Sequence, residues 1–506
     1  MKGGISMAYA GIDIGTSGCK MTIYNRKGEI LSSSGRTYQE TGDDGYRELD
    51  ANMVWAYTKE VIREASGNSP EPVQCIAVAS LGESIICLDK NNTVLANSML
   101  TGDKRGIDEC SIIEKKFSKE EVMDITGLPL SEMYALPKFI WLQNNSAVFK
   151  NTRHIFFYED YIGYLLTGKR MVSFSLAARS MAFDIRTKQW SQRLLTLAGL
   201  DRALFSAPVL SGTILGPVLP DIAEELGLPP GTLIAAGGHD QGCAGLGSGM
   251  TTFAEGEDGQ GTCEVMQFIL PKLTSSPYMI EKGIPCAPYV LPDIFLAQIE
   301  LTTCGILMNW FKDNIFANIR DFCGTSGIDF FSYMDTLAAE RHPGSIMLLP
   351  SFGSCGNPDI CYDAVGTICG LTIHTQPIEL YQAVKEGMAY QMFMAYETLS
   401  ELNINPDVIR VTGGGAASDY TLQLRADIFN IPMEVINSTQ AGTLGAAILA
   451  ASAVQLNMKI TDIVKDMVQV KKCFKPRSQY HRLYMERYDS YKQLYNDVGV
   501  KRYFAP

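Results

Sequence analysis

The chain is organised around the stretch from Tyr9 to Asn25, which reads Y-A-G-I-D-I-G-T-S-G-C-K-M-T-I-Y-N. An apolar run that carries Asp13 breaks at Gly15-Thr16-Ser17-Gly18 and resumes at Met21. This pattern predicts two strands joined by a tight glycine turn. Glycines let backbone N–H groups approach an anion closely, and the two hydroxyls between them add donors. The turn is therefore either a phosphate loop or an ordinary hairpin turn that faces water.

Asp13 adds a condition to the first of these interpretations. A carboxylate beside the turn would repel a bare phosphate, so a phosphate loop here requires a cation between the two groups. Mg²⁺ is the usual cation that accompanies nucleotide phosphates. If the turn binds a nucleotide, Asp13 is the predicted metal ligand.

Composition limits the classes of partner. The chain has 506 residues, 46% of them hydrophobic and 19% charged, which is typical of a globular protein with room for two or more cores. Its net charge is -12 and no basic run stands out, which argues against nucleic acid and anionic membrane surfaces as partners. No run approaches the ~18 apolar residues of a membrane span, and the first residues lack the apolar core of a signal peptide.

The cysteine pattern indicates a compartment. The 13 cysteines are scattered with no C-x-x-C pair. Several stand within apolar runs, namely Cys75, Cys87, Cys243 and Cys369. This usage predicts reduced, mostly buried thiols in a cytoplasmic protein.

Predicted strands and helices alternate along the chain, which indicates an α/β fold. Helical periodicity covers 50–65, 134–141, 158–166, 220–226, 303–311, 379–399, 420–429 and 443–454. Apolar runs predict strands at 73–80, 85–89, 232–236, 265–270 and 408–412. The polar and aromatic tail, 471–506, is expected to form helices on the surface.

Two further glycine-rich turns are similar to the turn at Gly15 to Gly18. Gly259-Gln260-Gly261-Thr262 precedes a strand, and Gly413-Gly414-Gly415 follows one. A second Gly-Thr turn one domain after the first suggests an internal duplication. Three such turns over two domains could hold a triphosphate and a nucleoside; the alternative is that they are tight turns in a large α/β protein.

Two carboxylates stand at predicted strand ends, where open α/β sheets place ligands. Asp240 follows a strand and two glycines, and an ionised aspartate there could accept a proton from an attacking hydroxyl. It could equally be the N-cap of the following helix. Glu83 has the same ambiguity between a hydroxyl-binding carboxylate and a solvated turn residue.

Together these stretches resemble the FGGY carbohydrate kinases over about 8–455. Asp13 to Ser17 is similar to the family's first nucleotide loop, and Gly238-His239-Asp240-Gln241 to the segment with the catalytic aspartate. Further similar stretches are 126–130 and 138–142 (first signature), 160–168, and 366–386 (second signature). Ala135 and Lys385 depart from the family's pattern.

The resemblance implies an α/β fold of two ribonuclease-H-like (actin-like ATPase) domains with a catalytic cleft between them. It implies an N-terminal domain over 7–249 that binds sugar and carries the first phosphate loop. A nucleotide-binding C-terminal domain over 250–470 and a helical tail over 471–506 would follow.

The resemblance also implies roles for residues, with ATP and Mg²⁺ as cofactors. Asp240 would be the catalytic base and Asp13 the metal ligand. The nucleotide would be bound by Thr16, Ser17, Lys20, Gly261, Thr262, Gly305, Asn309, Gly413, Gly414 and Ser418. The substrate would be bound by Glu83, Asp103, Tyr134 and Gln241.

The resemblance says least about the identity of the substrate. Gly82 stands where glycerol kinases have an arginine beside the glutamate, which removes a hydroxyl clamp. Asp103 and Arg105 fit the D-x-R of xylulokinase-like members. We expect ATP-dependent phosphorylation of a small carbohydrate, whether ketose, polyol or sugar acid. The alternatives are a catalytically silent regulator that binds nucleotide or sugar and an actin-like ATPase that acts on a protein; whether the chain forms a homodimer stays open.

Overall fold

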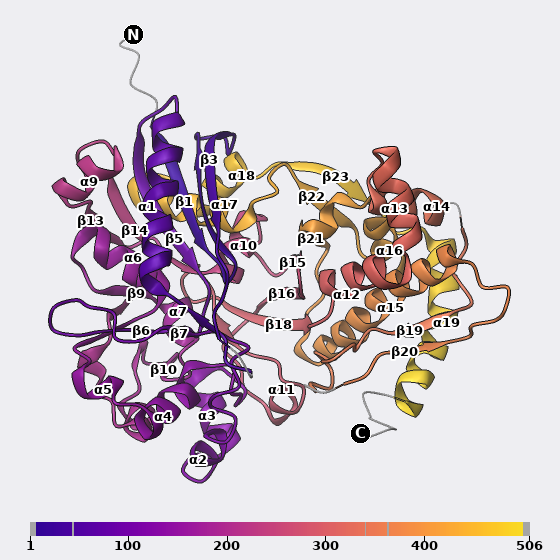
Figure 1. The fold of residues 1–506 in the computed structure, drawn as a ribbon, viewed down its shortest axis with the longest axis horizontal. Coiled ribbons are helices and arrows are strands. Elements are labelled where there is room, and N and C mark those ends of the chain that lie inside the picture. The colour runs from indigo at the N-terminus through magenta and orange to yellow at the C-terminus, as the bar shows by residue number, and fades with distance from the viewer. Residues whose placement is uncertain (1–6, 43–44, 340, 362–363, 499–506) are drawn as a thin grey trace.

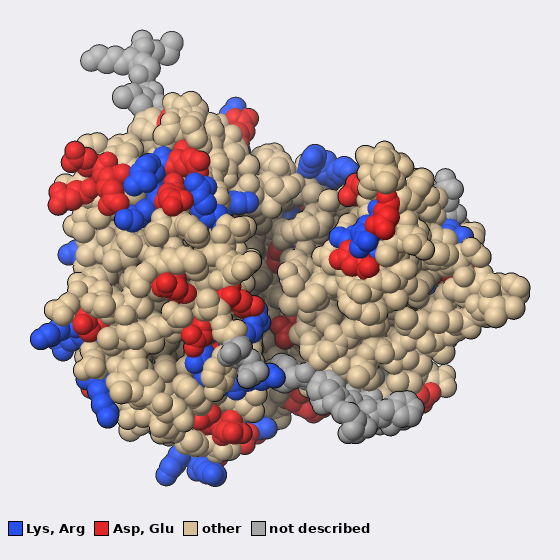
Figure 2. All heavy atoms as spheres, viewed as in Figure 1, with Lys and Arg blue, Asp and Glu red and all other residues tan. Residues whose placement is uncertain are grey.

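The computed structural model describes residues 7–42, 45–339, 341–361 and 364–498. Its two lobes each contain one large mixed sheet (Figure 1). The first half of the chain, indigo to magenta in Figure 1, builds one lobe, and most of the second half builds the other. Figure 2 shows a furrow between the lobes, with Asp and Glu atoms visible inside it.

The first sheet has the order β13-β14-β5-β1-β2-β3. Strands β1, β2 and β3 form an antiparallel meander, and β5 and β14 continue the sheet parallel to β1. The bounds are β1 (Ala8–Ile14), β2 (Gly18–Tyr24), β3 (Ile30–Thr37), β5 (Val73–Ser80), β13 (Ile214–Pro217) and β14 (Leu233–His239). Strands β1 and β5 are almost wholly buried, as expected where helices cover both faces of a sheet.

The second sheet repeats this plan in the order β17-β18-β16-β15-β21-β22-β23. Strands β15, β16 and β18 form the meander, and β21 and β22 continue parallel to β15. The bounds are β15 (Glu255–Gln260), β16 (Glu264–Leu270), β17 (Ala287–Pro288), β18 (Phe295–Leu301), β21 (Val408–Gly413), β22 (Met433–Ile436) and β23 (Val470–Phe474). The shared topology confirms the predicted duplication and the two-domain α/β fold.

Helices and short strands complete both lobes. In the first lobe they are α1 (Ala51–Asn68), β4 (Glu48–Leu49), β6 (Ile86–Leu88), β7 (Ser98–Met99), α2 (Cys110–Glu114), α3 (Lys119–Thr126), α4 (Ala135–Asn145), α5 (Val148–Asn151), β8 (His154–Phe156), α6 (Tyr158–Thr167), β9 (Met171–Ser173), α7 (Phe174–Ala178), β10 (Phe183–Asp184), β11 (Gln189–Trp190), α8 (Gln192–Leu195), β12 (Ala207–Val209) and α9 (Pro220–Leu226). From residue 240 onwards they are α10 (Asp240–Gly247), α11 (Pro277–Glu281), α12 (Gly305–Trp310), α13 (Ala317–Ser326), α14 (Phe330–Ala339), β19 (Met347–Leu349), β20 (Thr367–Cys369), α15 (Pro377–Glu397), α16 (Asp419–Phe429), α17 (Ala441–Val454), α18 (Ile460–Met467) and α19 (Ser478–Asp497). All eight predicted helices are present, with ends displaced by a few residues.

Helix α17 returns from the second half of the chain and packs on β1 and β5 of the first sheet. It also crosses α10 at backbone contact, because a Cβ on Gly247 would lie 1.9 Å from the carbonyl oxygen of Ala441. Only glycine permits that approach. The two halves are therefore joined through this helix pair, and the division of the chain at 249/250 and 470/471 stays a prediction.

The expectation about the tail is wrong. The tail does not form only surface helices, because Val470–Phe474 adds β23 to the edge of the second sheet. Helix α19 then buries a stripe of tyrosines at helical spacing against α15 and α16: Tyr484, Tyr488, Tyr491 and Tyr495. Among the cysteines named above, Cys369 is exposed, whereas the other three are buried. Within the described residues, no helix is long and apolar enough to cross a membrane.

Candidate active site

A cavity of about 650 Å³ lies between the lobes. The first lobe lines it with residues at the carboxyl ends of β5 and β14, the location expected for ligands in such sheets. These are Leu81, Gly82, Glu83, His239, Asp240 and Gln241, joined by Thr16, Tyr134 and Arg179. The second lobe contributes Val265 on β16, Gln298 and Glu300 on β18, and the segment 357–360.

Glu83 is a buried and paired carboxylate. Its side chain is 3% exposed and accepts a hydrogen bond of 2.9 Å from the hydroxyl of Thr101. It also forms an ion pair with the guanidinium of Arg179. That guanidinium stands 4.9 Å from the ring centroid of Tyr134, a cation–π arrangement. The interpretation of Glu83 as a solvated turn residue is therefore wrong.

Arg179 occupies the space beside Gly82. A Cβ at position 82 would lie 3.0 to 3.1 Å from three side-chain atoms of Arg179, so a larger residue there would collide with it. The guanidinium that the resemblance leads one to expect at position 82 thus comes from the end of α7. Sequence reasoning missed Arg179 because the surrounding run, L-A-A-R-S-M, carries no motif.

Asp240 is the first residue of α10, and His239 occupies the N-cap position, so the N-cap interpretation of Asp240 is wrong. Its side chain is 29% exposed, and Oδ1 lies 3.2 Å from Nε2 of His239. Oδ1 also accepts a hydrogen bond of 2.6 Å from the N–H of Gln241. Burial and the nearby carboxylate of Asp13 raise the pKa of Asp240 to about 8. Burial and Arg179 lower the pKa of His239 well below its usual value, so that ring is neutral at neutral pH.

A second cavity of about 820 Å³ adjoins the turn of the first hairpin. The predicted residues Asp13, Ser17 and Lys20 line it from one side. Thr412, Gly413 and the segment 439–443 at the start of α17 line it from the other. Because Thr16 lines the first cavity and Ser17 the second, this turn lies between the two.

Asp13 fits a Mg²⁺ site of the kind that nucleotides bring. In the described part of the chain, no group of three His, Cys, Asp or Glu residues could hold a metal by itself. Mg²⁺, however, usually keeps several waters and takes one or two carboxylates plus phosphate oxygens. Burial raises the pKa of Asp13 to about 6, and Lys20 offsets this only in part. Asp13 and Asp240 are close enough for mutual repulsion, which a divalent cation would relieve.

The other predicted nucleotide residues form a separate group. The N–H of Gly305 donates to the carbonyl of Gly261 at 3.0 Å, which seats the second turn on the start of α12. Asn309 is exposed, Gly414 begins a short 3₁₀ turn, and Ser418 N-caps α16. Gly261, Thr262, Gly305, Asn309, Gly414 and Ser418 lie outside the lining of both cavities as the described residues define them.

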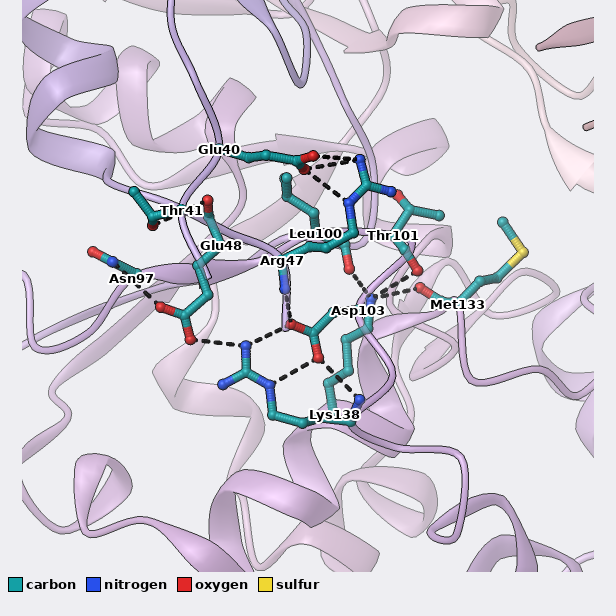
Figure 3. A network of polar contacts seen from close by, with 11 residues as sticks. Glu40, Thr41, Arg47, Glu48, Asn97, Leu100, Thr101, Asp103, Met133 and Lys138 are labelled. Atoms are coloured by element: carbon teal, nitrogen blue, oxygen red, sulfur yellow. Dashed lines mark hydrogen bonds and ion pairs between the residues drawn. The ribbon is translucent and has the colours of Figure 1, made fainter. Parts of the chain in front are cut away.

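Asp103 lies behind the cavity, within the network of Figure 3. Its carboxylate accepts hydrogen bonds from Nε of Arg105 at 2.8 Å and from the N–H of Arg47 at 2.8 Å. Arg105 continues to Glu48 at 2.8 Å. Both oxygens of Asp103 are therefore engaged, and the residue is absent from the cavity lining among the residues that the structure describes.

Lys138 connects this network to the cavity wall (Figure 3). Its buried ammonium donates to the carbonyls of Leu100 at 2.7 Å and Met133 at 3.0 Å. These carbonyls belong to the loop that carries Thr101 and to the segment that leads into Tyr134. Burial lowers the pKa of Lys138 to about 8. Lys138 thus fixes the relative position of two wall segments.

Comparison with known proteins identifies this arrangement. A model of the N-terminal domain of the FGGY family of carbohydrate kinases matches residues 8–247, and one of the C-terminal domain matches 262–454. The chain belongs to the FGGY family of carbohydrate kinases. Together the two matches span both lobes.

Relatives of this FGGY kinase carry several substrate names. The chain is 26% identical to a xylulose kinase of Staphylococcus epidermidis over 497 residues, which covers 96% of each protein. It is 25% identical to an autoinducer-2 kinase of Escherichia coli K12 over 501 residues, 96% of this chain and 93% of that protein. Solved xylulose kinase and gluconate kinase structures from Lactobacillus acidophilus share the fold, with TM-scores of 0.89 and 0.87, each at 23% identity and covering 98% of this chain and 99% of theirs.

The second lobe of this FGGY kinase supplies cavity residues that sequence reasoning did not single out. Glu300 and Gln298 point from β18, and Asn357 holds the backbone of Glu300 through two hydrogen bonds of 2.9 and 3.0 Å. Gln391 on α15 donates to the carbonyl of Asn357 at 3.1 Å and accepts from Tyr491 on α19 at 2.8 Å. The C-terminal helix therefore supports the wall of the cavity, a relation that no local pattern reveals.

Proposed function

We propose that this FGGY kinase transfers the γ-phosphoryl group of ATP to a hydroxyl of a small carbohydrate, with Asp240 as the general base. One observation carries the proposal: Asp240 and Thr16 of the glycine turn line the same cavity, beside the second cavity that holds the rest of that turn. A hydroxyl bound in the first cavity would thus lie next to a phosphate held by the turn.

In this proposal Asp240 orients the attacking hydroxyl and accepts its proton. The N–H of Gln241 holds one carboxylate oxygen, which leaves the other for the substrate. A pKa raised to about 8 makes the ionised carboxylate a stronger proton acceptor than an ordinary aspartate. Glu83, Tyr134 and Gln241 would contact the substrate, and Asp103 would act indirectly by supporting the loop of Thr101.

The nucleotide would lie across the two turns. Thr16, Ser17, Lys20, Gly261 and Thr262 would hold phosphate oxygens, and Gly413 and Gly414 would border the nucleoside. Gly305, Asn309 and Ser418 would reach the nucleotide from the second lobe, which requires closure of the furrow. Asp13 would hold Mg²⁺, which when bound neutralises charge on the β- and γ-phosphates. Positioning and charge stabilisation account for most of the rate of such transfers.

The test is Asp240→Asn, assayed by sugar-dependent ADP release. Loss of the general base should lower kcat by about 10²- to 10⁴-fold while ATP binding, followed by calorimetry, is retained. Asp221→Asn is the matched control, because Asp221 stands in the first turn of α9 on the exposed surface and should leave turnover unchanged.

Three results would contradict the proposal. Unchanged turnover of the Asp240→Asn variant would remove the general base from the mechanism. ADP release by the wild-type protein that is independent of any sugar would favour an ATPase acting on another partner, and nucleotide binding without turnover would favour a silent regulator.

A further inference from the structure

The charges that line the first cavity are unbalanced. Two basic side chains line it among the described residues, Arg179 and His239. The acidic side chains in the same lining are Glu83, Glu132, Asp240, Glu281, Glu300 and Asp359. Since the ring of His239 is neutral at neutral pH, Arg179 is the cation that an anionic substrate would have to use.

Arg179 is already paired. Both Nε and Nη2 of its guanidinium approach Oε1 of Glu83, and the side chains of Arg179 and Glu83 are only 7% and 3% exposed. Arg179 also lies in the field of Asp240 and Glu300. A substrate carboxylate that approaches Arg179 would have to share its guanidinium with Glu83 and would be repelled by Asp240 and Glu300. Taking the guanidinium from Glu83 altogether would leave Glu83 as a buried charge without its cation, which is costly.

The same pair suits an uncharged hydroxyl. A hydroxyl both donates and accepts, so it can accept from a guanidinium N–H and donate to a carboxylate oxygen at once. Glu83 and Arg179 present these two partners side by side, and the amide of Gln298 adds another from the opposite lobe. The cavity volume of about 650 Å³ accommodates a small sugar and its water.

We propose that this kinase phosphorylates uncharged ketoses or polyols and discriminates against sugar acids, and that the Glu83–Arg179 pair sets this preference. The inference rests on the proposed function and narrows it. Fold similarity does not decide the point, because the similar structures include proteins named for a neutral sugar and for gluconate.

The first experiment uses the wild-type protein with substrates matched in carbon number. ADP release is measured for xylulose, ribulose and xylitol against xylonate, and for fructose and hexitols against gluconate. The inference expects kcat/KM for a neutral substrate at least about tenfold above that for any of the acids, and turnover of an acid alone would overturn it while leaving the proposed function intact. A rate of ADP release that no compound of the panel changes would contradict the proposed function and the inference together.

The second experiment frees the charge of Arg179. Glu83→Gln keeps the size of the side chain but leaves the guanidinium unpaired, so the ratio of kcat/KM for acids to that for neutral substrates should rise at least about tenfold. Glu132→Gln is the control, because it removes a carboxylate of the same cavity that does not pair with Arg179, and its ratio should stay close to that of the wild type. If a folded Glu83→Gln variant keeps the wild-type ratio, the Glu83–Arg179 pair does not set the preference for neutral substrates.

Discussion

The two hairpins β1–β2 and β15–β16 share one topology but differ in their charges. In the first, Asp13 stands two residues before the turn glycine Gly15, with Lys20 opposite it in the strand register. In the second, the residue two before Gly261 is Gly259. A carboxylate therefore borders the second cavity at one hairpin, and the other hairpin has no side chain at that position.

The second hairpin keeps its acidic groups inside. Arg425 on α16 pairs with Glu264 through two contacts of 2.6 Å and lies 3.4 Å from Asp258. Gln260 donates to Asp258 at 2.6 Å, and both acidic side chains are fully buried. The difference shows that the duplicated hairpin is only a scaffold. Asp258 and Glu264 are structural because a guanidinium pairs with them, whereas among the described residues no guanidinium pairs with Asp13, which lines the second cavity.

The largest expected effect comes from breaking the buried pair. Arg425→Met should lower the free energy of unfolding by about 3 to 5 kcal/mol, because it leaves two buried carboxylates without their partner. Urea unfolding measures this loss. Adding Glu264→Gln to the same variant should restore part of the stability, and a loss below about 1 kcal/mol in Arg425→Met would contradict a structural role for the network.

Removal of the Asp13 carboxylate should have the opposite pattern of effects, with a loss of activity and no loss of stability. Asp13→Asn should cost about 100-fold or more in sugar-dependent kcat/KM and shift the Mg²⁺ dependence of the rate to higher concentrations. Its free energy of unfolding should not fall, and at pH 8 it should rise by about 1 to 3 kcal/mol, because burial raises the pKa of Asp13 to about 6 and the neutral amide removes that cost. Asp221→Asn again serves as the surface control, and a large loss of stability with an unchanged Mg²⁺ dependence would show that the two hairpins do not divide their roles as described.

The sequence predicts local structure and the first lobe's carboxylates well. The apolar run 73–80 coincides with β5, and the turns at Gly15 and Gly261 fall between antiparallel strands as expected, because these features depend on neighbours in the chain. Asp240 and Glu83 could be predicted as cavity residues because the topology of an open α/β sheet places residues at the carboxyl ends of its central strands at the ligand-binding edge.

Features that depend on tertiary packing were not predictable. Arg179 reaches the cavity from α7, and Glu300 reaches it from an edge of the other sheet, so neither has a local signal. The sequence around Asp103 does not show which way its side chain points. In the structure the carboxylate bonds to Arg105 and does not line the cavity. The docking of α17 likewise depends on glycines far from it in the chain, Gly11 on β1 and Gly247 on α10.

The smallest effect concerns a third buried carboxylate of the second hairpin, Glu257 on β15. It accepts hydrogen bonds from Thr412 at 2.6 Å and from Gln267 at 2.8 Å, without a cation, and burial raises its pKa to about 7. An acid whose folded pKa is raised destabilises the protein as pH rises above its unfolded value, so the folded state loses stability between about pH 5 and pH 8.

Glu257→Gln should therefore be more stable than the wild type at pH 8, by about 1 to 3 kcal/mol, and nearly equal to it at pH 5. The amide can be accommodated because the buried Oε1 of Gln267 has no hydrogen-bond partner and can turn to accept from the new N–H group. Urea unfolding of both proteins at the two pH values measures the difference. A difference in free energy of unfolding that shrinks as pH rises would mean that the protein stabilises Glu257 in its ionised form, which would contradict the raised pKa of this group.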